Sequence, residues 1–286
     1  MFDVLAVGDL MLDVRVAADA LAPGGDVAGR VRVRPAGTSA NAAVWAAATG
    51  ARAVVCARVG DDLTGKLLSD ALERAGVRAL LTVDPTVETG TMLVVTTKGE
   101  RSMVADRGAN ARITPDDLPQ RLTAGAVLVS GYLACDPRTA PVARAAIARS
   151  SAAHVAVDAG SWPLIDAIGA DAFFRVTEGA TLVFANEREA AALTGRDAED
   201  AVEELGRRYG AAVVKLGPKG AVLSWDGLVL RFGGTEILEV DSTGAGDAFD
   251  GAFLATLALG GTPADALQAA CAAGARVAAS PEAWPT

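Results

Sequence analysis

The stretch of sequence that says most about this protein is Asp241–Leu254, which reads DSTGAGDAFDGAFL. From its middle onward, side chains recur at the i, i+3, i+4, i+7 and i+8 spacing of one helix face, at Phe249, Ala252, Phe253, Thr256 and Leu257. This spacing predicts a helix that begins near Gly246 and ends at Gly260. A glycine-rich turn therefore leads directly into the N-terminus of a helix.

That turn has the chemistry of an anion-binding site. The N–H groups of Gly244, Ala245 and Gly246 are expected to lie free at the positive end of the helix dipole, where they can converge on a phosphate. Asp247 follows in the first helical turn, and it either caps the helix or takes a proton from a hydroxyl that attacks phosphorus. A cap needs no pair of glycines around an alanine in front of it, which favours the catalytic interpretation.

The rest of the chain alternates short apolar strands with helices. Strands are predicted at residues 2–8, 53–59, 126–130, 154–158, 181–184 and 211–216, with helices that include 40–49 and 65–75. This alternation predicts an α/β fold with a doubly wound, mainly parallel sheet. No linker, repeat or low-complexity tract divides the sequence, so one domain is expected over residues 1–286.

Two segments break the alternation because their side chains follow the two-residue period of strands. They are Gly29–Pro35 and Thr91–Asp106, and the second contains a predicted hairpin turn at Thr97–Glu100. Antiparallel strands of this kind cannot join a parallel core between its units. We therefore expect a small β-sheet lid, made from parts of residues 11–36 and 89–108, beside the strand ends where α/β proteins bind ligands.

The composition of the 286 residues excludes several classes of protein. Hydrophobic residues make up 51% and charged residues 21%, which excludes a disordered chain. No apolar run reaches the roughly 18 residues of a membrane span, and the first residues lack the basic start of a signal peptide. The formal net charge of −9 argues against nucleic-acid binding. A cytoplasmic protein without membrane or nucleic-acid partners is expected.

The scarcity of histidine and the spacing of cysteine narrow the chemistry further. The one histidine, His154, lies inside a predicted strand and is expected to be structural. The three cysteines, Cys56, Cys135 and Cys271, lack the spacing of disulfide or zinc sites and are expected to be buried apolar residues. Carboxylates are therefore the expected bases.

The motifs together resemble one known family. Asp241–Ala252 is similar to the C-terminal signature of the PfkB carbohydrate kinases, also called the ribokinase family, which reads roughly D-T-x-G-A-G-D-x-F-x-G-A. Ala36–Asn41 resembles the family's G-G-x-x-x-N block, with alanine in place of the first glycine. Four further blocks match in order, at Gly8–Asp13, Val59–Asp62, Asn186–Glu189 and Lys215–Gly220. The resemblance covers essentially the whole chain and implies a ribokinase-like fold.

The resemblance implies roles on the acceptor side of the site. Asp247 is expected to be the catalytic base, with Gly244, Ala245 and Gly246 as the anion hole for the transferring phosphoryl group. The acceptor is expected to contact residues near the opening strand, in the Ala36–Asn41 block and in the lid. These residues are Asp13, Gly37, Thr38, Asn41, Met92 and Ala105. Val94 is expected to face the acceptor with them.

The resemblance also implies roles on the nucleotide side. ATP is expected to lie along Asn186, Lys215, Gly217 and Gly220, and Glu189 to hold Mg²⁺ through water. The carboxylate of Asp241 and the carbonyl of Thr243 are expected to hold a monovalent cation, K⁺. Without the family, Asn186–Glu189 would simply start a helix, and Gly217–Gly220 would be a hairpin turn.

The implied activity is transfer of the γ-phosphoryl group of ATP to a primary hydroxyl of a sugar or sugar-like acceptor. Two alternatives stay open: a nucleoside kinase of the same fold, and a non-catalytic sugar or nucleotide sensor. The sensor has no need of a base at Asp247. Thr38 stands where some ribose-specific members carry lysine, which argues against ribose as the acceptor. A homodimer that forms through the lid is expected.

Overall fold

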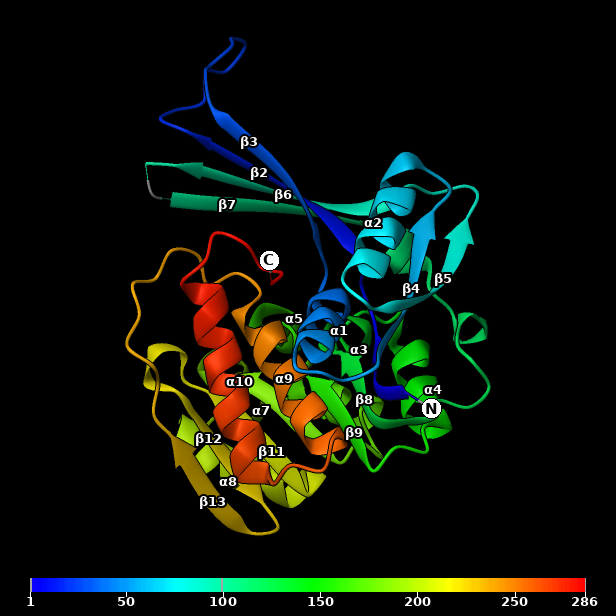
Figure 1. The fold of residues 1–286 in the computed structure, drawn as a ribbon, viewed down its shortest axis with the longest axis vertical. Helices are drawn as coiled ribbons and strands as arrows, with labels where there is room; N and C mark the ends of the chain where they lie inside the picture. The colour runs from blue at the N-terminus through cyan, green and yellow to red at the C-terminus, as the bar shows by residue number, and fades with distance from the viewer. Residues whose placement is uncertain (1, 99, 286) are drawn as a thin grey trace.

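A computed structural model describes residues 2–98 and 100–285 (Figure 1). The large sheet has nine strands. In spatial order they are β13 (Leu228–Phe232), β12 (Ala221–Trp225), β11 (Ala211–Lys215), β10 (Leu182–Asn186), β9 (His154–Asp158), β8 (Ala124–Ser130), β1 (Phe2–Val7), β4 (Ala53–Gly60) and β5 (Arg78–Asp84). Every neighbouring pair from β11 to β5 is parallel, whereas β12 and β13 add antiparallel strands at one edge. The predicted doubly wound, mainly parallel α/β sheet is confirmed.

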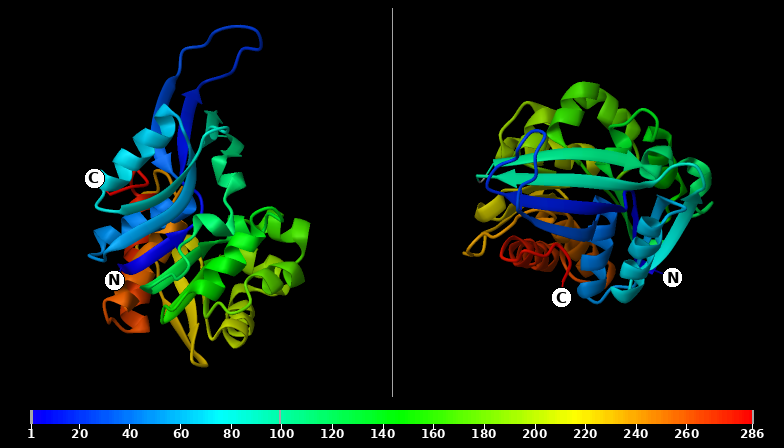
Figure 2. Two further views of the ribbon diagram at one scale, coloured as in Figure 1. Left: turned by 90° about the vertical axis from the view of Figure 1, so that its right-hand side faces the viewer. Right: turned by 90° about the horizontal axis from the view of Figure 1, so that it is seen from above.

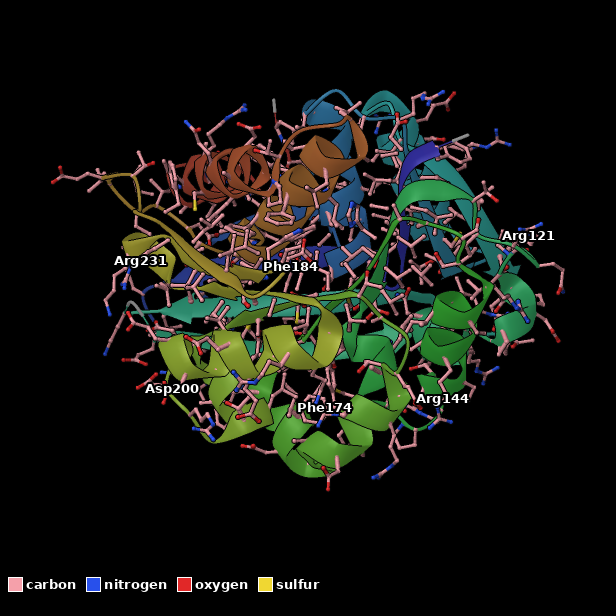
Figure 3. The ribbon with its side chains drawn as sticks, turned by 90° about the horizontal axis from the view of Figure 1, so that it is seen from below. Arg121, Arg144, Phe174, Phe184, Asp200 and Arg231 are labelled. Carbon is pink, nitrogen blue, oxygen red and sulfur yellow. The ribbon has the colours of Figure 1, made fainter. Side chains whose placement is uncertain are left out.

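Helices cover both faces of this sheet, as Figures 2 and 3 show. One face carries α1 (Thr38–Ala48), α2 (Leu63–Arg74), α9 (Ala245–Ala258) and α10 (Pro263–Ala278). The other carries α3 (Gly131–Ala134), α4 (Ala140–Arg149), α5 (Trp162–Ile168), α6 (Ala170–Val176), α7 (Glu187–Thr194) and α8 (Ala198–Tyr209). Strands buried on both faces need continuous apolar runs, which is why β8 reads AGAVLVS.

Each face has its own apolar core. Phe184 of β10 packs against Phe249 and Phe253 of α9, with ring centroids 6.3 and 5.3 Å apart. Figure 3 shows Phe184 beside the α9 layer and Phe174 among the helices of the opposite layer. The α9 helix is therefore packed directly on the sheet, so its N-terminus has a fixed position relative to the strand ends.

A separate sheet of four strands lies above the carboxyl ends of the parallel strands (Figure 1). Its spatial order is β3 (Arg30–Ala36), β2 (Met11–Ala18), β6 (Thr89–Thr97) and β7 (Glu100–Gly108). The prediction of antiparallel pairing is correct for β2–β3 and β6–β7, and these two antiparallel pairs are joined by a parallel pairing of β2 with β6, which the sequence pattern did not address. β2 and β6 each leave the large sheet from the same edge, so they enter the lid in the same direction.

The predicted turn at Thr97–Glu100 includes Gly99, which lies outside the described residues. The base of the lid is held by hydrogen bonds. The Asn110 side chain accepts from the Leu10 N–H at 3.1 Å and donates to the Leu10 carbonyl at 2.9 Å. Arg107 of β7 forms an ion pair with Asp9 at 2.8 Å. These bonds fix the point where the chain passes from β1 into the lid.

Three smaller predictions have clear outcomes. All three cysteines are buried, as expected. His154 is half-buried at the start of β9, with its ring 5.5 Å from that of Trp225, a packing position at the edge of the sheet opposite the carboxyl ends of the strands. Within residues 2–98 and 100–285, no helix combines the length and apolar character needed to cross a bilayer.

Candidate active site

The functional side chains lie where the parallel strands end. Asp158, Asn186 and Lys215 are the last residues of the adjacent strands β9, β10 and β11. In a doubly wound sheet this edge is where ligands bind, because the loops there diverge to opposite faces. The N-terminus of α9 reaches the same edge, since Gly246 lies against Lys215: a Cβ built on the glycine would be 3.3 Å from the lysine Nζ.

Asp247 lies in the first turn of α9. One of its carboxylate oxygens accepts a hydrogen bond from Asn41 Nδ2 at 2.7 Å. Burial, opposed by the Asn41 hydrogen bond and reinforced by the charge of Asp158, raises the pKa of Asp247 to about 7. A carboxylate with a pKa near the operating pH is suited to general base catalysis.

The Asn41 side chain donates a hydrogen bond to the Asp247 carboxylate and is itself held by Trp284. Its Oδ1 accepts from Trp284 Nε1 at 2.7 Å while its Nδ2 donates to Asp247. Asn41 was expected to bind acceptor hydroxyls, and in the structure both ends of its amide are engaged by protein groups. The residue orients Asp247, and the indole of Trp284 holds Asn41 in that orientation.

The turn before α9 depends on Gly244, which is the N-cap of the helix and has a left-handed φ of 86°. A side chain there would be strained, and its Cβ would lie 3.2 Å from that of Ala283. The prediction of three free N–H groups is wrong at Ala245, whose N–H donates to the Ser242 carbonyl at 3.1 Å because the turn closes on itself. The N–H groups of Gly246 and Asp247, for which the described residues provide no acceptor, remain at the positive end of α9.

Lys215 lies at the centre of a buried charged cluster. Its ammonium is 2.9 Å from Asp158 and 3.0 Å from Asp250, which lies one turn after Asp247 on α9. Burial acts to lower the pKa of Lys215, but the charges of Asp158 and Asp250 outweigh it and raise the pKa. Burial raises the pKa of Asp250 well above its usual range, although Lys215 opposes this shift. Lys215 is therefore held fully charged.

Asn186 and Glu189 form a reciprocal capping box at the start of α7. The Asn186 side chain accepts from the Glu189 N–H at 3.0 Å, and Glu189 accepts from the Asn186 N–H at 2.8 Å. The interpretation as a helix start is thus correct. Glu189 is also buried, and burial together with the charge of Asp158 raises its pKa to about 7. Glu189 therefore belongs to a group of four carboxylates, with Asp158, Asp247 and Asp250, that act on one another around the Lys215 ammonium.

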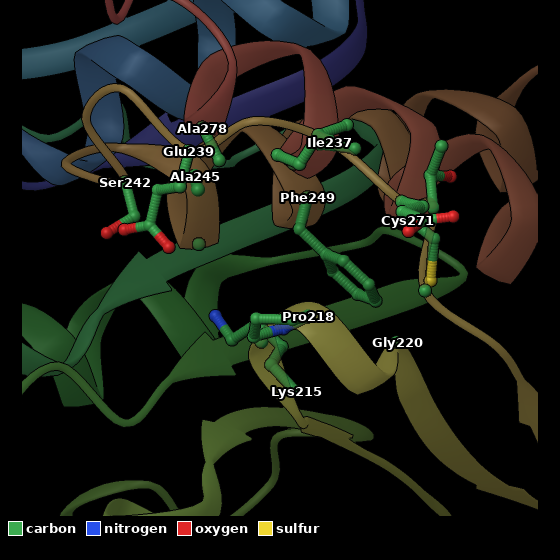
Figure 4. A pocket seen from close by; sticks show the side chains of 17 residues that line it. Lys215, Pro218, Gly220, Ile237, Glu239, Ser242, Ala245, Phe249, Cys271 and Ala278 are labelled. Carbon is green, nitrogen blue, oxygen red and sulfur yellow. The ribbon is translucent and has the colours of Figure 1, made fainter.

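A cavity of about 410 Å³ opens beside this cluster (Figure 4). Lys215, Pro218 and Gly220 line one side of it, and Ala245 and Phe249 of α9 line another. The three residues predicted to line the nucleotide, Lys215, Gly217 and Gly220, all lie here. Gly217–Gly220 is also the turn that joins β11 to the antiparallel β12, and it contains the short 3₁₀ helix η3 (Gly217–Lys219).

The acceptor-side residues come from the lid and from α1. Asp13 is buried on β2, and burial raises its pKa although Arg15 opposes this. The strand register places Asp13 opposite Met92, and Met92 opposite Ala105. Met92 is half-buried in this row, whereas Ala105 is exposed on the edge strand.

Three further residues predicted for the acceptor side are also placed. Gly37 and Thr38 lie at the N-terminus of α1, where Gly37 is the N-cap with a φ of 110°. A Cβ on Gly37 would lie 2.3 Å from the Asp9 carbonyl oxygen, so this close approach requires glycine. Val94, two residues after Met92 on β6, is buried.

Asp241 is bonded within the chain. One of its oxygens accepts from the Thr243 N–H at 3.0 Å and from the Thr243 hydroxyl at 2.7 Å, and the other is paired with the Arg15 guanidinium. The carboxylate predicted to hold a monovalent cation thus faces a guanidinium of the lid. The positive charge next to the anion-binding turn comes from the protein itself.

The family profile described as "pfkB family carbohydrate kinase" matches residues 1–284. The chain belongs to the PfkB family of carbohydrate kinases. It is 30% identical to the ATP-dependent ribose-1-phosphate kinase of Halopiger xanaduensis over 96% of this chain and 91% of the relative.

Solved structures show the same fold as this PfkB chain. The adenosine kinase from Sinorhizobium meliloti has a TM-score of 0.87 at 24% identity, covering 99% of this chain and 96% of its own. A candidate ribokinase II from E. coli, solved in complex with ATP and Mg²⁺, has a TM-score of 0.85 at 22% identity, covering 98% and 94%. The ribokinase-like fold predicted from the motifs is confirmed.

Sequence reasoning missed four polar side chains of this PfkB site: Arg15, Asp158, Asp250 and Trp284. Two of them carried a usable signal. Asp158 ends a predicted strand at the ligand-binding edge, and Asp250 follows Asp247 by three residues on the same helix. Arg15 and Trp284 carried none, because their partners lie more than 200 residues away along the chain.

Proposed function

We propose that this chain transfers the γ-phosphoryl group of ATP to a primary hydroxyl of a sugar or sugar-like acceptor. The observation that carries the proposal is the position of Asp247. Its neighbour Gly246 lines the 410 Å³ cavity, and its carboxylate is bonded to Asn41 on the acceptor side. A base at the junction of two compartments can take a proton from a hydroxyl in one while the phosphoryl group arrives from the other.

The residues around Asp247 have complementary roles in this proposal. Asp247 accepts the hydroxyl proton as the oxygen attacks phosphorus. The Gly246 and Asp247 N–H groups and the α9 dipole stabilise the negative charge that develops on the phosphoryl oxygens. Lys215, held by Asp158 and Asp250, positions the turn and the nucleotide.

The carboxylate cluster fits Mg²⁺ bound together with ATP. Asp158, whose pKa is lowered, is ionised beside the ammonium, and Glu189 and Asp247, each with a pKa raised to about 7, are partly ionised at neutral pH, so the site keeps an excess of negative charge for a cation. Within the described residues no three acidic, histidine or cysteine side chains converge to hold a metal directly. Mg²⁺ usually keeps several waters and binds through one or two carboxylates and substrate phosphates. Glu189 would hold it through water, and the ion would neutralise phosphate charge.

A panel of acceptors tests the proposal. ADP release is measured with Mg²⁺-ATP and a set of sugars, sugar phosphates and nucleosides, and product formation is checked by mass spectrometry. We expect acceptor-dependent ADP release with at least one sugar or sugar derivative. Turnover of nucleosides alone would identify a nucleoside kinase. Binding of a sugar or nucleotide, with no ADP release in the presence of any acceptor, would identify a sensor.

The outer face of the lid supports a homodimer. Its apolar side chains include Val31, Val33 and Val104, which are 61%, 53% and 64% exposed. These residues alternate with those that face the site, so they form one side of an open sheet. Two lids packed face to face would cover them. Light scattering is expected to give the mass of a dimer, and Val33→Lys the mass of a monomer.

Two further expectations stay predictions: a single domain and a cytoplasmic location. A third expectation is that activity responds to K⁺, and the Arg15–Asp241 pair reduces the size of the response that we expect. We infer that the guanidinium supplies most of the charge that a monovalent cation would add at this turn.

A further inference from the structure

A second cavity, of about 300 Å³, lies between the lid and the turn before α9. We call it the arginine cleft, because four arginines line it: Arg15 of β2 and Arg30, Arg32 and Arg34 of β3. Alternate residues of a strand point to the same face, which is why the three β3 arginines all point into the cleft. Val240, Asp241, Thr243 and Pro281 form its opposite wall.

The register brings the arginines close to one another and to Asp13. Arg32 lies opposite Arg15, and Arg34 lies opposite Asp13. Arg15 joins two carboxylates, because one of its nitrogens is 3.3 Å from Asp13 and another pairs with Asp241. The cleft is therefore continuous with the residue expected to bind acceptor hydroxyls, and it borders the turn that leads to Asp247.

Carboxylates do not balance the charge in the cleft. Within the described part of the chain, ion pairs bring three carboxylates, Asp13, Asp241 and Glu282, to three of the four guanidinium groups and none to Arg30. The Glu282 contact is 3.0 Å from Arg34 and a loose 3.8 Å from Arg32. Burial lowers the pKa of Arg34, Glu282 opposes this, and the charges of Arg15 and Arg32 lower it further.

A second observation points to a missing partner. Arg15 Nε is buried and has no hydrogen-bond partner among the described residues. A buried donor without an acceptor is unfavourable, and so are four guanidinium groups around one cavity. Both costs are removed when an anion enters the cleft, because guanidinium groups bind phosphate oxygens in pairs.

We propose that the arginine cleft binds a phosphate group carried by the acceptor, so that the preferred acceptor is a phosphorylated sugar with a free primary hydroxyl. The inference rests on the proposed kinase function and specifies its substrate class. Asp13 receives the hydroxyls of the sugar ring, and Arg32 and Arg34 bind the phosphate. The free primary hydroxyl then lies towards Asp247.

Matched pairs of acceptors test this assignment. The pairs are ribose against ribose 1-phosphate and fructose against fructose 6-phosphate, since each sugar phosphate keeps a free primary hydroxyl. We expect kcat/KM to be about 100-fold higher for the phosphorylated member of at least one pair, as two or more charge-assisted hydrogen bonds would give. Titration calorimetry with the preferred sugar phosphate, without ATP, measures binding independently of turnover.

The variant Arg32→Gln tests the cleft itself, because the Arg32 side chain is 46% exposed and its removal leaves no buried charge. The ratio of kcat/KM between sugar phosphate and parent sugar is expected to fall about tenfold or more, with a matching loss in the calorimetric affinity. Arg121→Gln is the matched control, since Arg121 is exposed, lies just before β8 and does not line the arginine cleft. If Arg32→Gln kept the same ratio of kcat/KM between sugar phosphate and parent sugar as Arg121→Gln and the wild type, the proposal would be overturned.

Other outcomes separate this proposal from the kinase function. Turnover of neutral sugars with no preference for their phosphates would overturn the cleft assignment and leave the kinase function intact. If no acceptor of any class gave ADP release, the kinase function would be overturned. Inorganic phosphate is expected to inhibit competitively with the sugar phosphate. If inorganic phosphate instead accelerated turnover of a neutral sugar, the cleft would be a site for free phosphate and not for the acceptor.

Discussion

The two sides of Asp247 carry opposite charge. On the nucleotide side, the charges of three carboxylates, Asp158, Asp250 and Glu189, act on the single Lys215 ammonium. On the acceptor side, four arginines meet three carboxylates. The difference corresponds to how each ligand arrives. ATP brings Mg²⁺, which a negative site attracts, whereas a phosphorylated acceptor without a metal ion needs guanidinium groups.

The two regions also differ in how they are assembled. Lys215, Asp158 and Asp250 belong to strand ends and to a helix packed on the sheet, so their cluster is part of the core. The Arg15–Asp241 and Arg34–Glu282 pairs connect the lid to the turn before α9 and to the segment after α10. The nucleotide side is therefore built before ligands bind, while the acceptor side depends on the position of the lid.

The largest expected effect lies at the boundary between the two regions. Asp247→Asn keeps the shape of the side chain but removes the base, so kcat is expected to fall about 10²- to 10⁴-fold. ATP and acceptor affinities, measured by calorimetry, are expected to stay within about tenfold of the wild-type values, because the base acts in the transition state and is not needed to bind the ground-state substrates. A variant with nearly normal kcat would show that Asp247 only caps α9.

The next effect contrasts the stability of the two regions. Lys215→Met leaves two buried carboxylates without their cation, so the free energy of unfolding is expected to fall by about 3–5 kcal/mol. Arg32→Gln removes a half-exposed guanidinium of the lid, whose contact with Glu282 is a loose 3.8 Å, and is expected to cost less than about 1 kcal/mol. Urea unfolding of both variants makes the comparison. Equal losses would mean that the lid is as integral to the core as the Lys215 cluster.

Asp13→Ala tests the acceptor side alone. The carboxylate can accept two hydrogen bonds from sugar hydroxyls, each worth about 1.5–3 kcal/mol. The KM for the acceptor is expected to rise about tenfold or more while the KM for ATP changes little. Met92→Leu, in the same row of the lid, is a conservative control that keeps the apolar contact. Equal increases in both KM values would remove Asp13 from the acceptor site.

The pH profile sharpens the assignment of the base. Burial raises the pKa of Asp247 to about 7, and the hydrogen bond from Asn41 opposes that shift. Only the deprotonated carboxylate can accept a proton, so kcat/KM is expected to rise about tenfold per pH unit up to about pH 7 and then level off. Asn41→Ala removes the opposing hydrogen bond and is expected to move this limb to higher pH. Because Glu189 has a similarly raised pKa, Glu189→Gln should keep the limb if it belongs to Asp247.

The smallest expected effect concerns K⁺. With Arg15 already paired to Asp241, adding K⁺ to an assay in tetramethylammonium buffer at constant ionic strength is expected to change the wild-type rate less than about twofold. Arg15→Gln removes the guanidinium charge beside Asp241, so K⁺ is expected to stimulate the variant more. Strong stimulation of the wild type would show that the cation and the guanidinium act together.

Local patterns predicted a large part of this molecule. The apolar spacing after Gly246 located the start of α9 to within one residue, and the alternation at Gly29–Pro35 and Thr91–Asp106 located two parts of the lid. The direction of β2 against β6 could not be predicted in this way, because it depends on where both strands leave the large sheet. The Asn186–Glu189 pair was open to two interpretations, a helix start and a ligand site. Only the structure shows that Glu189 is also buried near Asp158, which raises the pKa of its carboxylate.

The sequence by itself determined a helix start near Gly246, the place of Asp247 in its first turn and the set of strands that end at the site. Those features depend on the conformations of neighbouring residues, which the sequence specifies directly. Only the tertiary structure decided that Asn41 orients Asp247, that Trp284 holds Asn41, and that Arg15 meets Asp241 across a separation of 226 residues. Such contacts depend on strand register and on helix packing over the whole chain, and no spacing within a motif encodes them.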